Sequence, residues 1–208
     1  MIPLLVDCTG KRIIIFGGGT VATRKAKYFS GNADVLLISR SFLPEITSLP
    51  VKRRVLNVST VGDDLIEEII DGAFLVISTF SDPSQNNRIG DLCSSRAILF
   101  NNADGETGDV ILPSVIGGKN YTIAISTKGS SPAVSRFIRK HLEETYPALD
   151  EMIALQSELR EQLKQNEPSQ ARRTEILREV LNDKELWEIL KKDPSRACKL
   201  AKKRYLHE

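Results

Sequence analysis

The 208-residue sequence has little of what several function classes need. No apolar run approaches the roughly 18 residues of a membrane-spanning helix, so we expect no membrane partner. The net charge of +2 disfavours a nucleic-acid binder driven by bulk charge, although it leaves room for a local basic groove. The N-terminus lacks a basic region and a cleavage site, which predicts a cytoplasmic protein without a secretory signal.

Metal-ligating side chains are also scarce. The three cysteines, Cys8, Cys93 and Cys198, lie far apart and form no CxxC pair, which favours reduced thiols over metal ligands. The two histidines, His141 and His207, have no cysteine cluster near them in the sequence. We therefore expect neither a protein metal site nor a nucleophile–histidine–acid triad.

The strongest positive signal is a strand, a glycine turn and a helix in immediate succession. Residues 11–16 are rich in isoleucine and end at Gly17, Gly18 and Gly19, and the helix-compatible residues 21–30 follow at once. Gly17 permits a tight turn, and Gly19 lets the backbone approach a pyrophosphate closely. The first N–H groups of the helix then face the anion. The pattern favours dinucleotide binding, and its alternative is a glycine turn of an α/β protein that binds nothing. No Gly-Lys-Ser/Thr follows, so the turn is not a P-loop.

Short apolar strands alternate with helical segments through the first half of the chain. The expected strands are residues 35–39, 53–58, 74–78 and 98–101, and the expected helices are 63–70, with Asp63 as N-cap, and 83–95. This alternation predicts an α/β fold in which an N-terminal Rossmann-type parallel sheet is covered on both faces.

The pattern changes after Asp109. Residues 110–113 and 121–126 are predicted strands without a helix between them, and residues 117–120 have the composition of a hairpin turn. A basic helix is expected over residues 132–145. Beyond Pro147 the chain is charged and helical in its spacing, which predicts two or three short helices.

Candidate ligand-binding residues follow from the rule that open α/β sheets bind ligands at the carboxyl ends of their strands. That rule selects residues 17–21, 39–42, 79–81 and 101–104, and with them Thr79 and Asn101. The end of the second strand carries no Asp or Glu, the residue that usually binds the ribose about 20 positions past the glycines. Arg40 is there instead, and it either accepts a 2′-phosphate, which favours NADP, or is a solvated surface residue.

Two further groups of residues could hold or change a substrate. Asp104 lies in an Asn- and Gly-rich loop, where it is either a general base or a turn residue that bonds to its own backbone. The second group is a polar loop before the basic helix, which resembles an anion site at a helix N-terminus but also fits an ordinary capped helix start. Its residues are Ser126, Thr127, Lys128, Gly129, Ser130 and Ser131, with Arg136 one turn into the helix.

Taken together, these motifs resemble the siroheme synthase family, in which precorrin-2 dehydrogenase is often combined with sirohydrochlorin ferrochelatase. The resemblance rests on four segments in this order and spacing. They are Gly17-Gly18-Gly19-Thr20-Val21-Ala22, Asn101-Asn102-Ala103-Asp104, Leu112-Pro113-Ser114, and Ser126-Thr127-Lys128-Gly129-Ser130-Ser131-Pro132. The resemblance covers nearly the whole chain and is weakest after about Pro147. The methyltransferase domain that some members carry after this module is absent from the sequence.

The resemblance implies a Rossmann domain over residues 1–113, a dimerisation segment over 114–147 and a helical domain over 148–208, in a homodimer. It implies that NAD⁺, with NADP as an alternative, oxidises the tetrapyrrole precorrin-2 to sirohydrochlorin, and that Fe²⁺ is then a substrate of chelation. It makes Asp104 the catalytic residue and assigns cofactor contacts to Thr20, Val21, Ser41 and Phe42. The alternatives are a dehydrogenase without chelatase activity and a non-catalytic NAD(H)-sensing module.

Overall fold

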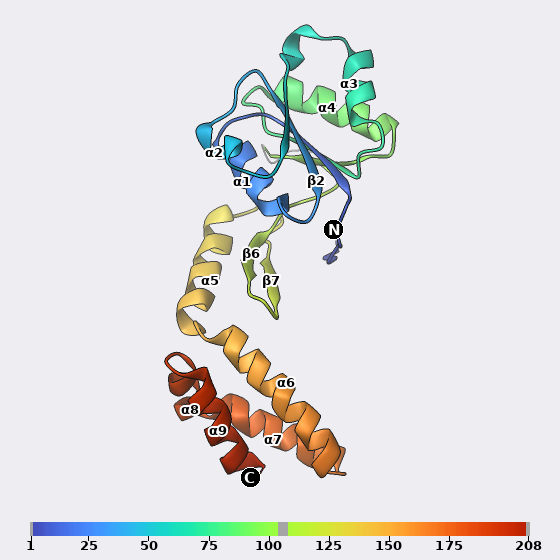
Figure 1. The fold of residues 1–208 in the computed structure, drawn as a ribbon. Helices are drawn as coiled ribbons and strands as arrows, with labels where there is room; N and C mark the ends of the chain where they lie inside the picture. The colour runs from blue at the N-terminus through green and yellow to red at the C-terminus, as the bar shows by residue number, and fades with distance from the viewer. Residues whose placement is uncertain (1, 104–107, 207–208) are drawn as a thin grey trace. The chain divides into compact units, whose positions relative to one another are not determined.

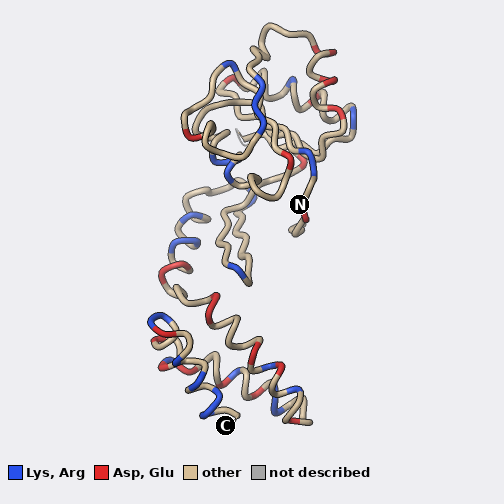
Figure 2. The backbone as a smooth tube through the Cα atoms, viewed as in Figure 1, with Lys and Arg blue, Asp and Glu red and all other residues tan. Residues whose placement is uncertain are grey.

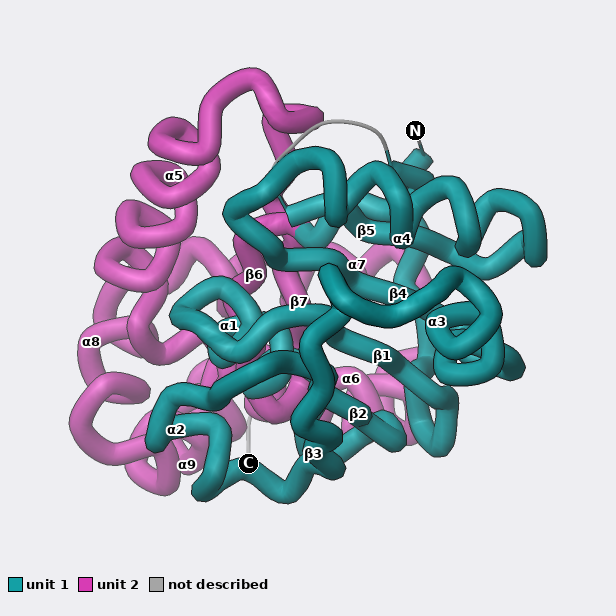
Figure 3. The backbone as a smooth tube through the Cα atoms, turned by 90° about the horizontal axis from the view of Figure 1, so that it is seen from above, with its two compact units in different colours: residues 1–112 teal, residues 113–208 magenta. Residues whose placement is uncertain are grey.

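The computed structural model describes residues 2–103 and 108–206, and the chain divides into two compact units (Figure 3). The first unit is Met1–Leu112 and the second is Pro113–Glu208. Each unit has its own hydrophobic core.

A five-stranded parallel sheet forms the centre of the first unit (Figure 1). Its strands are β1 (Arg12–Phe16), β2 (Asp34–Ser39), β3 (Lys52–Val55), β4 (Leu75–Ser78) and β5 (Leu99–Asn102). Their order in the sheet is β3-β2-β1-β4-β5. This arrangement confirms the predicted Rossmann-type parallel sheet.

Both faces of the sheet are covered, which explains why its central strands are apolar at consecutive positions. The helices are α1 (Thr20–Phe29), α2 (Pro44–Thr47), α3 (Asp63–Ile70) and α4 (Pro83–Ser95), with a 3₁₀ turn η1 (Val58–Thr60). Ile14 and Phe16 of β1 pack in one buried cluster with residues of α3 and α4. Ile13 and Ile15 pack on the other face with residues of α1. Successive side chains of a strand point to opposite faces of the sheet, so alternate residues of β1 belong to two separate buried layers.

Several predicted boundaries of the first unit are wrong for local reasons. β3 ends at Val55 because Asn57 accepts a hydrogen bond from the Ser59 N–H and starts η1. Residues 110–113 form no strand, although the Val110 N–H donates to the Phe100 carbonyl at 3.1 Å. The N-cap of α3 is Gly62, and Asp63 is the first helical residue.

The second unit contains a hairpin followed by helices. The hairpin strands are β6 (Ser114–Gly117) and β7 (Thr122–Ile125), and the helices are α5 (Pro132–Thr145), α6 (Leu149–Asn166), α7 (Gln170–Asn182), α8 (Lys184–Leu190) and α9 (Pro194–Tyr205). Within the described residues four helices therefore follow Pro147, where the sequence predicts two or three. The predicted hairpin turn is confirmed, and Asp150 of α6 accepts hydrogen bonds from the Lys119 and Asn120 N–H groups at 2.5 and 2.8 Å. Throughout residues 2–103 and 108–206, no helix has the length and apolar character needed to cross a membrane.

Candidate functional site

The sheet reverses its winding between β1 and β4. The chain passes from β1 outward to β2 and β3, and then returns to place β4 on the other side of β1. In open α/β sheets, ligands bind in the crevice outside the carboxyl ends of the strands at such a switch point. The glycine turn follows β1 and Thr79 follows β4, so the topology brings these two predicted segments together.

Gly17 lies in direct contact with the end of β4. Its φ is +127°, and a Cβ at this position would lie 2.0 Å from the Thr79 hydroxyl oxygen. Thr79 is held in turn by the Phe16 carbonyl, which accepts its N–H and its hydroxyl, each at 2.9 Å. Both the backbone conformation and the space therefore require glycine at position 17.

Gly18 contacts the loop that follows β2. A Cβ here would lie 1.9 Å from the Ser41 carbonyl oxygen, and the Gly18 carbonyl accepts the Leu43 N–H at 3.0 Å. Ser41 is exposed, while the half-buried Phe42 packs against the cluster that contains α1. The loop expected to line an adenosine pocket is thus held against the glycine turn.

Gly19 differs from its neighbours because it faces open space. No atom lies within 4 Å of the position that a Cβ would occupy, and its φ of −90° is ordinary extended backbone. The residue is exposed and is the N-cap of α1. The close approach that Gly19 permits is therefore an approach from outside the folded chain.

The N-terminus of α1 is electrostatically suited to an anion. No side chain caps it, and no acidic residue lies in its first turn. Thr20 and Val21 are exposed there, with 38% of Val21 accessible. The first N–H groups of a helix lack intrahelical partners and carry the positive end of the helix dipole, so they favour a phosphate at this position.

Asn101 of β5 places a second polar group near the carboxyl edge of the sheet. Its side chain is 5% exposed, and its amide nitrogen donates to the Val110 carbonyl at 2.7 Å. Its amide oxygen is buried without a hydrogen-bond partner among the described residues. Because an unpaired buried acceptor costs about 1–3 kcal/mol, a hydrogen-bond donor supplied to this oxygen would stabilise the end of β5. Asp104, the predicted catalytic residue, lies outside the described residues.

Arg40 follows β2 and is exposed. The neighbouring edge strand β3 adds the exposed basic residues Lys52, Arg53 and Arg54, of which Lys52 pairs with Asp34 at 2.8 Å. In the parallel register Lys52 lies beside Leu36, toward the amino end of β2, whereas Arg54 lies beside Ile38 near its carboxyl end. Arg40 and Arg54 are therefore the basic residues nearest the position where a carboxylate for ribose would be expected.

The predicted anion loop of the second unit forms the start of α5. The Ser131 hydroxyl caps the helix by accepting the Val134 N–H at 3.4 Å. Thr127 lies beneath it, where its hydroxyl oxygen accepts the Ser131 N–H at 3.0 Å and lies 3.3 Å from the Ser135 hydroxyl. Lys128 and Gly129 turn the chain with φ of +54° and +87°. The hydroxyls of Thr127 and Ser131 thus shape the helix start, which agrees with the capping interpretation and leaves anion binding a prediction.

The helix that follows carries basic residues before acidic ones (Figure 2). Arg136 lies in the first half of α5, Arg139 and Lys140 lie just past its midpoint, and Glu143 and Glu144 lie near its end. Arg139 is engaged with Glu143 at 2.6 Å, whereas Arg136 is exposed. Arg136 is accordingly the residue of this helix that is best placed to bind an anion at the preceding loop.

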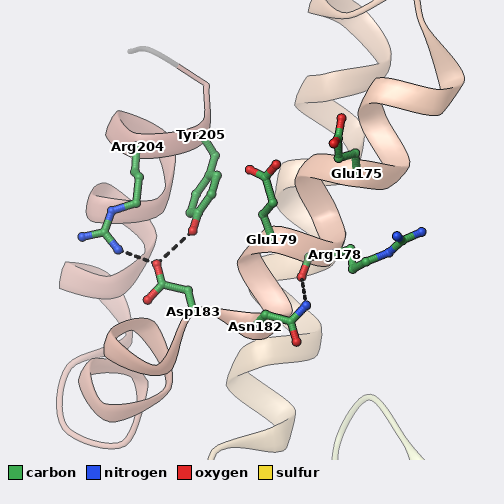
Figure 4. Close-up of a pocket in the computed structure, with 7 residues that line it drawn as sticks. All are labelled: Glu175, Arg178, Glu179, Asn182, Asp183, Arg204 and Tyr205. Atoms are coloured by element: carbon green, nitrogen blue, oxygen red, sulfur yellow. Dashed lines mark hydrogen bonds and ion pairs between the residues drawn. The ribbon is translucent and has the colours of Figure 1, made fainter.

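A polar hollow of about 540 Å³ in the second unit carries none of the predicted site residues (Figure 4). It is lined by Glu175, Arg178, Glu179, Asn182, Asp183, Arg204 and Tyr205. Arg204 and Tyr205 both bond to Asp183, which also caps α8. Burial opposes ionisation of Asp183, but the Leu186 N–H and these two side chains together hold its pKa below the ordinary value. Arg204 and Tyr205 hold Asp183 at the start of α8, whereas Glu175 and Glu179 pair with Arg172, which does not line the hollow. Because the bonds within the hollow join helix ends, we assign it a structural role.

The described part of the chain contains no group of side chains that could bind a metal ion. No three His, Cys, Asp or Glu side chains of residues 2–103 and 108–206 come together in a way that could hold an ion. Cys8, Cys93 and Cys198 form no disulfide, and burial raises the pKa of the Cys93 thiol to about 12. Cys93 is therefore a core residue and not a nucleophile.

Sequence reasoning missed one polar residue beside the switch point. Asn86 of α4 is fully buried, and it bonds to the Ser78 side chain and to the backbone of Phe80. The sequence does contain a signal for it: at helical spacing, Asn86 falls on the same face of α4 as Ile89 and Cys93, and that face is buried. A polar side chain on an otherwise apolar helix face requires a buried partner.

Comparison with known proteins agrees with this geometry. Residues 4–114 match the family described as "Putative NAD(P)-binding". A protein of Methanosarcina barkeri (strain Fusaro / DSM 804) named Precorrin-2 dehydrogenase is 42% identical over 191 residues, which are 89% of this chain and 85% of that protein. Siroheme synthase of Sodalis glossinidius (strain morsitans) is 29% identical over 184 residues, which are 87% of this chain and only 38% of that protein.

Among solved structures, "SirC, precorrin-2 dehydrogenase" matches with a TM-score of 0.70 and 22% sequence identity. The match covers 98% of this chain and 100% of that one. At this identity the likeness supports the fold, which agrees with the predicted α/β sheet and helical C-terminal region.

Proposed function

This chain belongs to the precorrin-2 dehydrogenase family, with an NAD(P)-binding domain in its first unit, and from that premise we propose that it oxidises precorrin-2 to sirohydrochlorin with NAD⁺. The observation that carries the proposal is the open, uncapped start of α1 behind Gly19, at the switch point of the sheet. It supports a dinucleotide site, and the 42% identity to a protein named Precorrin-2 dehydrogenase supports the substrate.

The residues present fit a dinucleotide. The first N–H groups of α1, at Thr20 and Val21, would hold the pyrophosphate, and Ser41 and Phe42 would line the adenosine side. Thr79 follows β4 and Asn101 lies in β5, at the edge of the sheet where the nicotinamide is expected. When bound, the dinucleotide supplies the hydride acceptor.

The oxidation removes a hydride and a proton from the macrocycle, so NADH and one proton accompany sirohydrochlorin. Asp104 receives that proton, an assignment that rests on the family resemblance of the Asn101-Asn102-Ala103-Asp104 segment. Hydride transfer further requires that the substrate be held in position. Lys128, the hydroxyls of residues 126–131 and Arg136 suit the carboxylates of precorrin-2 by their chemistry.

Chelation is the second candidate activity, favoured by the match to proteins named siroheme synthase. Entry of Fe²⁺ into sirohydrochlorin displaces two protons and yields siroheme. The macrocycle supplies the ligands for iron, so the reaction needs from the protein only a group that takes protons. Asp104 is the candidate for this step as well.

We also propose that the protein is a homodimer formed through its middle segment. Val134, Phe137 and Ile138 share one face of α5 and are 47%, 70% and 37% exposed. The β6–β7 hairpin beside this helix has only two strands, which are marginal by themselves in water. A second copy of the chain would cover both features.

The direct test is anaerobic incubation of the protein with precorrin-2 and NAD⁺, followed by addition of Fe²⁺. NADH absorbance reports the oxidation, and the macrocycle spectrum reports metal insertion against a control without enzyme. NADH formation without accelerated insertion would identify a dehydrogenase only. If neither NAD⁺ nor NADP⁺ is reduced, the dehydrogenase proposal fails and a nucleotide-sensing module becomes the better hypothesis. Parallel titrations of NADH and NADPH establish whether Arg40 binds a 2′-phosphate.

A further inference from the structure

Both the oxygen and the nitrogen of the Asn86 side-chain amide bond to the two residues that flank Thr79. Its side-chain oxygen accepts the Ser78 hydroxyl at 2.6 Å and the Phe80 N–H at 3.0 Å. Its side-chain nitrogen donates to the Phe80 carbonyl at 2.9 Å. Both Asn86 and Ser78 are 0% exposed. One buried side chain of α4 thus fixes the backbone where the chain leaves β4.

The segment that Asn86 fixes contacts both neighbouring strand ends. Thr79 bonds to the Phe16 carbonyl and occupies the space that a side chain at Gly17 would need. On the other side, the Ser78 carbonyl accepts the Ala103 N–H at 3.0 Å. A shift of this segment would therefore reach the glycine turn and the end of β5 together.

We propose that Asn86 is a positioning residue for the dinucleotide, acting through Thr79. It keeps Thr79 against Gly17, and so keeps the glycine turn and the start of α1 in the shape that receives the pyrophosphate. This inference rests on the proposed dinucleotide function and adds a residue of α4 to it. Burying an amide is costly without hydrogen bonds, and the three side-chain hydrogen bonds of Asn86 all go to Ser78 and Phe80 beside the proposed site.

The test separates positioning from plain stability by measuring NADH affinity and melting temperature for the same variants. Asn86→Ala should raise the Kd for NADH about tenfold, the factor that about 1.4 kcal/mol of binding free energy represents. Cys93→Ala is the matched control, since Cys93 is equally buried on the same face of α4. It should lower the melting temperature and leave the Kd within twofold of the wild-type value.

A double-mutant cycle with Thr79→Val tests the route of the effect. If Asn86 acts through Thr79, the double variant binds NADH about as weakly as Asn86→Ala alone. An unchanged Kd in Asn86→Ala, or independent effects that multiply in the double variant, would overturn the inference. Failure of the wild-type protein to bind any dinucleotide would instead overturn the proposed function.

Asn86→Asp keeps the inference testable if the alanine variant does not fold. The carboxylate retains an acceptor for Ser78 and the Phe80 N–H but places an oxygen against the Phe80 carbonyl. Protonation of that carboxyl restores a donor, so the Kd ratio of Asn86→Asp to wild type should fall as the pH falls from 8 to 5. An Asn86→Asp protein that binds NADH as tightly as the wild type at pH 8 and at pH 5 contradicts the positioning role.

Discussion

Alanine substitutions at Gly18 and Gly19 should have opposite consequences, although the two residues are adjacent. An added methyl group at Gly18 would lie 1.9 Å from the Ser41 carbonyl oxygen and 2.9 Å from the Ser39 hydroxyl. The obstacle at 1.9 Å is backbone, so the loop after β2 must move. That movement also strains the hydrogen bond from the Leu43 N–H to the Gly18 carbonyl. At Gly19 the same methyl group meets nothing within 4 Å.

The magnitudes follow from these contacts. Overpacking of this kind costs about 1–3 kcal/mol, so Gly18→Ala should lower the melting temperature by roughly 4–12 °C for a unit of this size. Gly19 has backbone angles that alanine adopts freely, and Gly→Ala at such a position stabilises by about 0.4–1 kcal/mol. Gly19 is also the N-cap of α1, where alanine is less favourable than glycine, and this offsets the gain. Gly19→Ala should therefore melt close to the wild-type temperature. Its methyl group points to where the pyrophosphate is expected, so its Kd for NADH should rise about tenfold or more.

Differential scanning calorimetry and NADH fluorescence titration on the same preparations measure both quantities. The informative result is a Gly19→Ala protein that folds normally and binds NADH poorly. A wild-type Kd in Gly19→Ala would show that the dinucleotide does not pass over this residue. A loss of stability in Gly19→Ala as large as in Gly18→Ala would show that the open space at Gly19 is wrong.

Three further predictions concern other parts of the chain. Asp104→Asn should lower kcat for NADH formation by about 10²–10⁴-fold with unchanged NADH affinity, and a kcat near wild type would remove Asp104 from the mechanism. Phe137→Glu should convert the homodimer into monomers in sedimentation experiments, and a wild-type protein that is already monomeric contradicts the proposed interface. Burial lowers the pKa of Lys25 from the ordinary 10.5 to about 8. Between pH 8 and 10.5 the unfolded chain therefore holds a proton that the folded chain has lost, and the free energy of unfolding rises with pH. Lys25→Met should have a higher melting temperature at pH 7 and should lack this contribution to the rise, whereas melting temperatures equal to the wild type at every pH would show that the ammonium group is solvated.

The fold of the first unit was predictable because the pattern of apolar residues and the positions of the turn-forming residues indicate the same strands and helices. Consecutive apolar residues at 13–16 and 75–77 indicated strands buried on both faces, and the structure has two separate hydrophobic layers there. Element ends were less predictable, because they depend on single side-chain bonds such as that of Asn57 to the Ser59 N–H. The four C-terminal helices were undercounted because Asp183 both ends α7 and caps α8 without a proline or glycine to mark the break.

The candidate site was predictable only where its residues follow strand ends along the chain. Gly17, Thr79 and Asn101 were found this way, since the carboxyl ends of parallel strands meet at one edge of the sheet. The crowding that separates Gly18 from Gly19 comes from Ser41, more than 20 residues away, and no local pattern carries it.

The proposed role of Asn86 extends the dinucleotide site beyond the residues of the glycine turn. A glycine turn can be recognised because its residues contact the ligand through backbone geometry, which constrains residue type directly. A side chain that holds such a turn in place needs only to be long enough and to have suitable donors and acceptors. Asn86 satisfies both requirements from α4, the helix that follows β4. Because the Ser78–Phe80 segment joins the glycine turn to the end of β5, loosening it should disturb the pyrophosphate and nicotinamide ends together. On this proposal, dinucleotide affinity depends on the buried side of α4 as well as on the exposed start of α1.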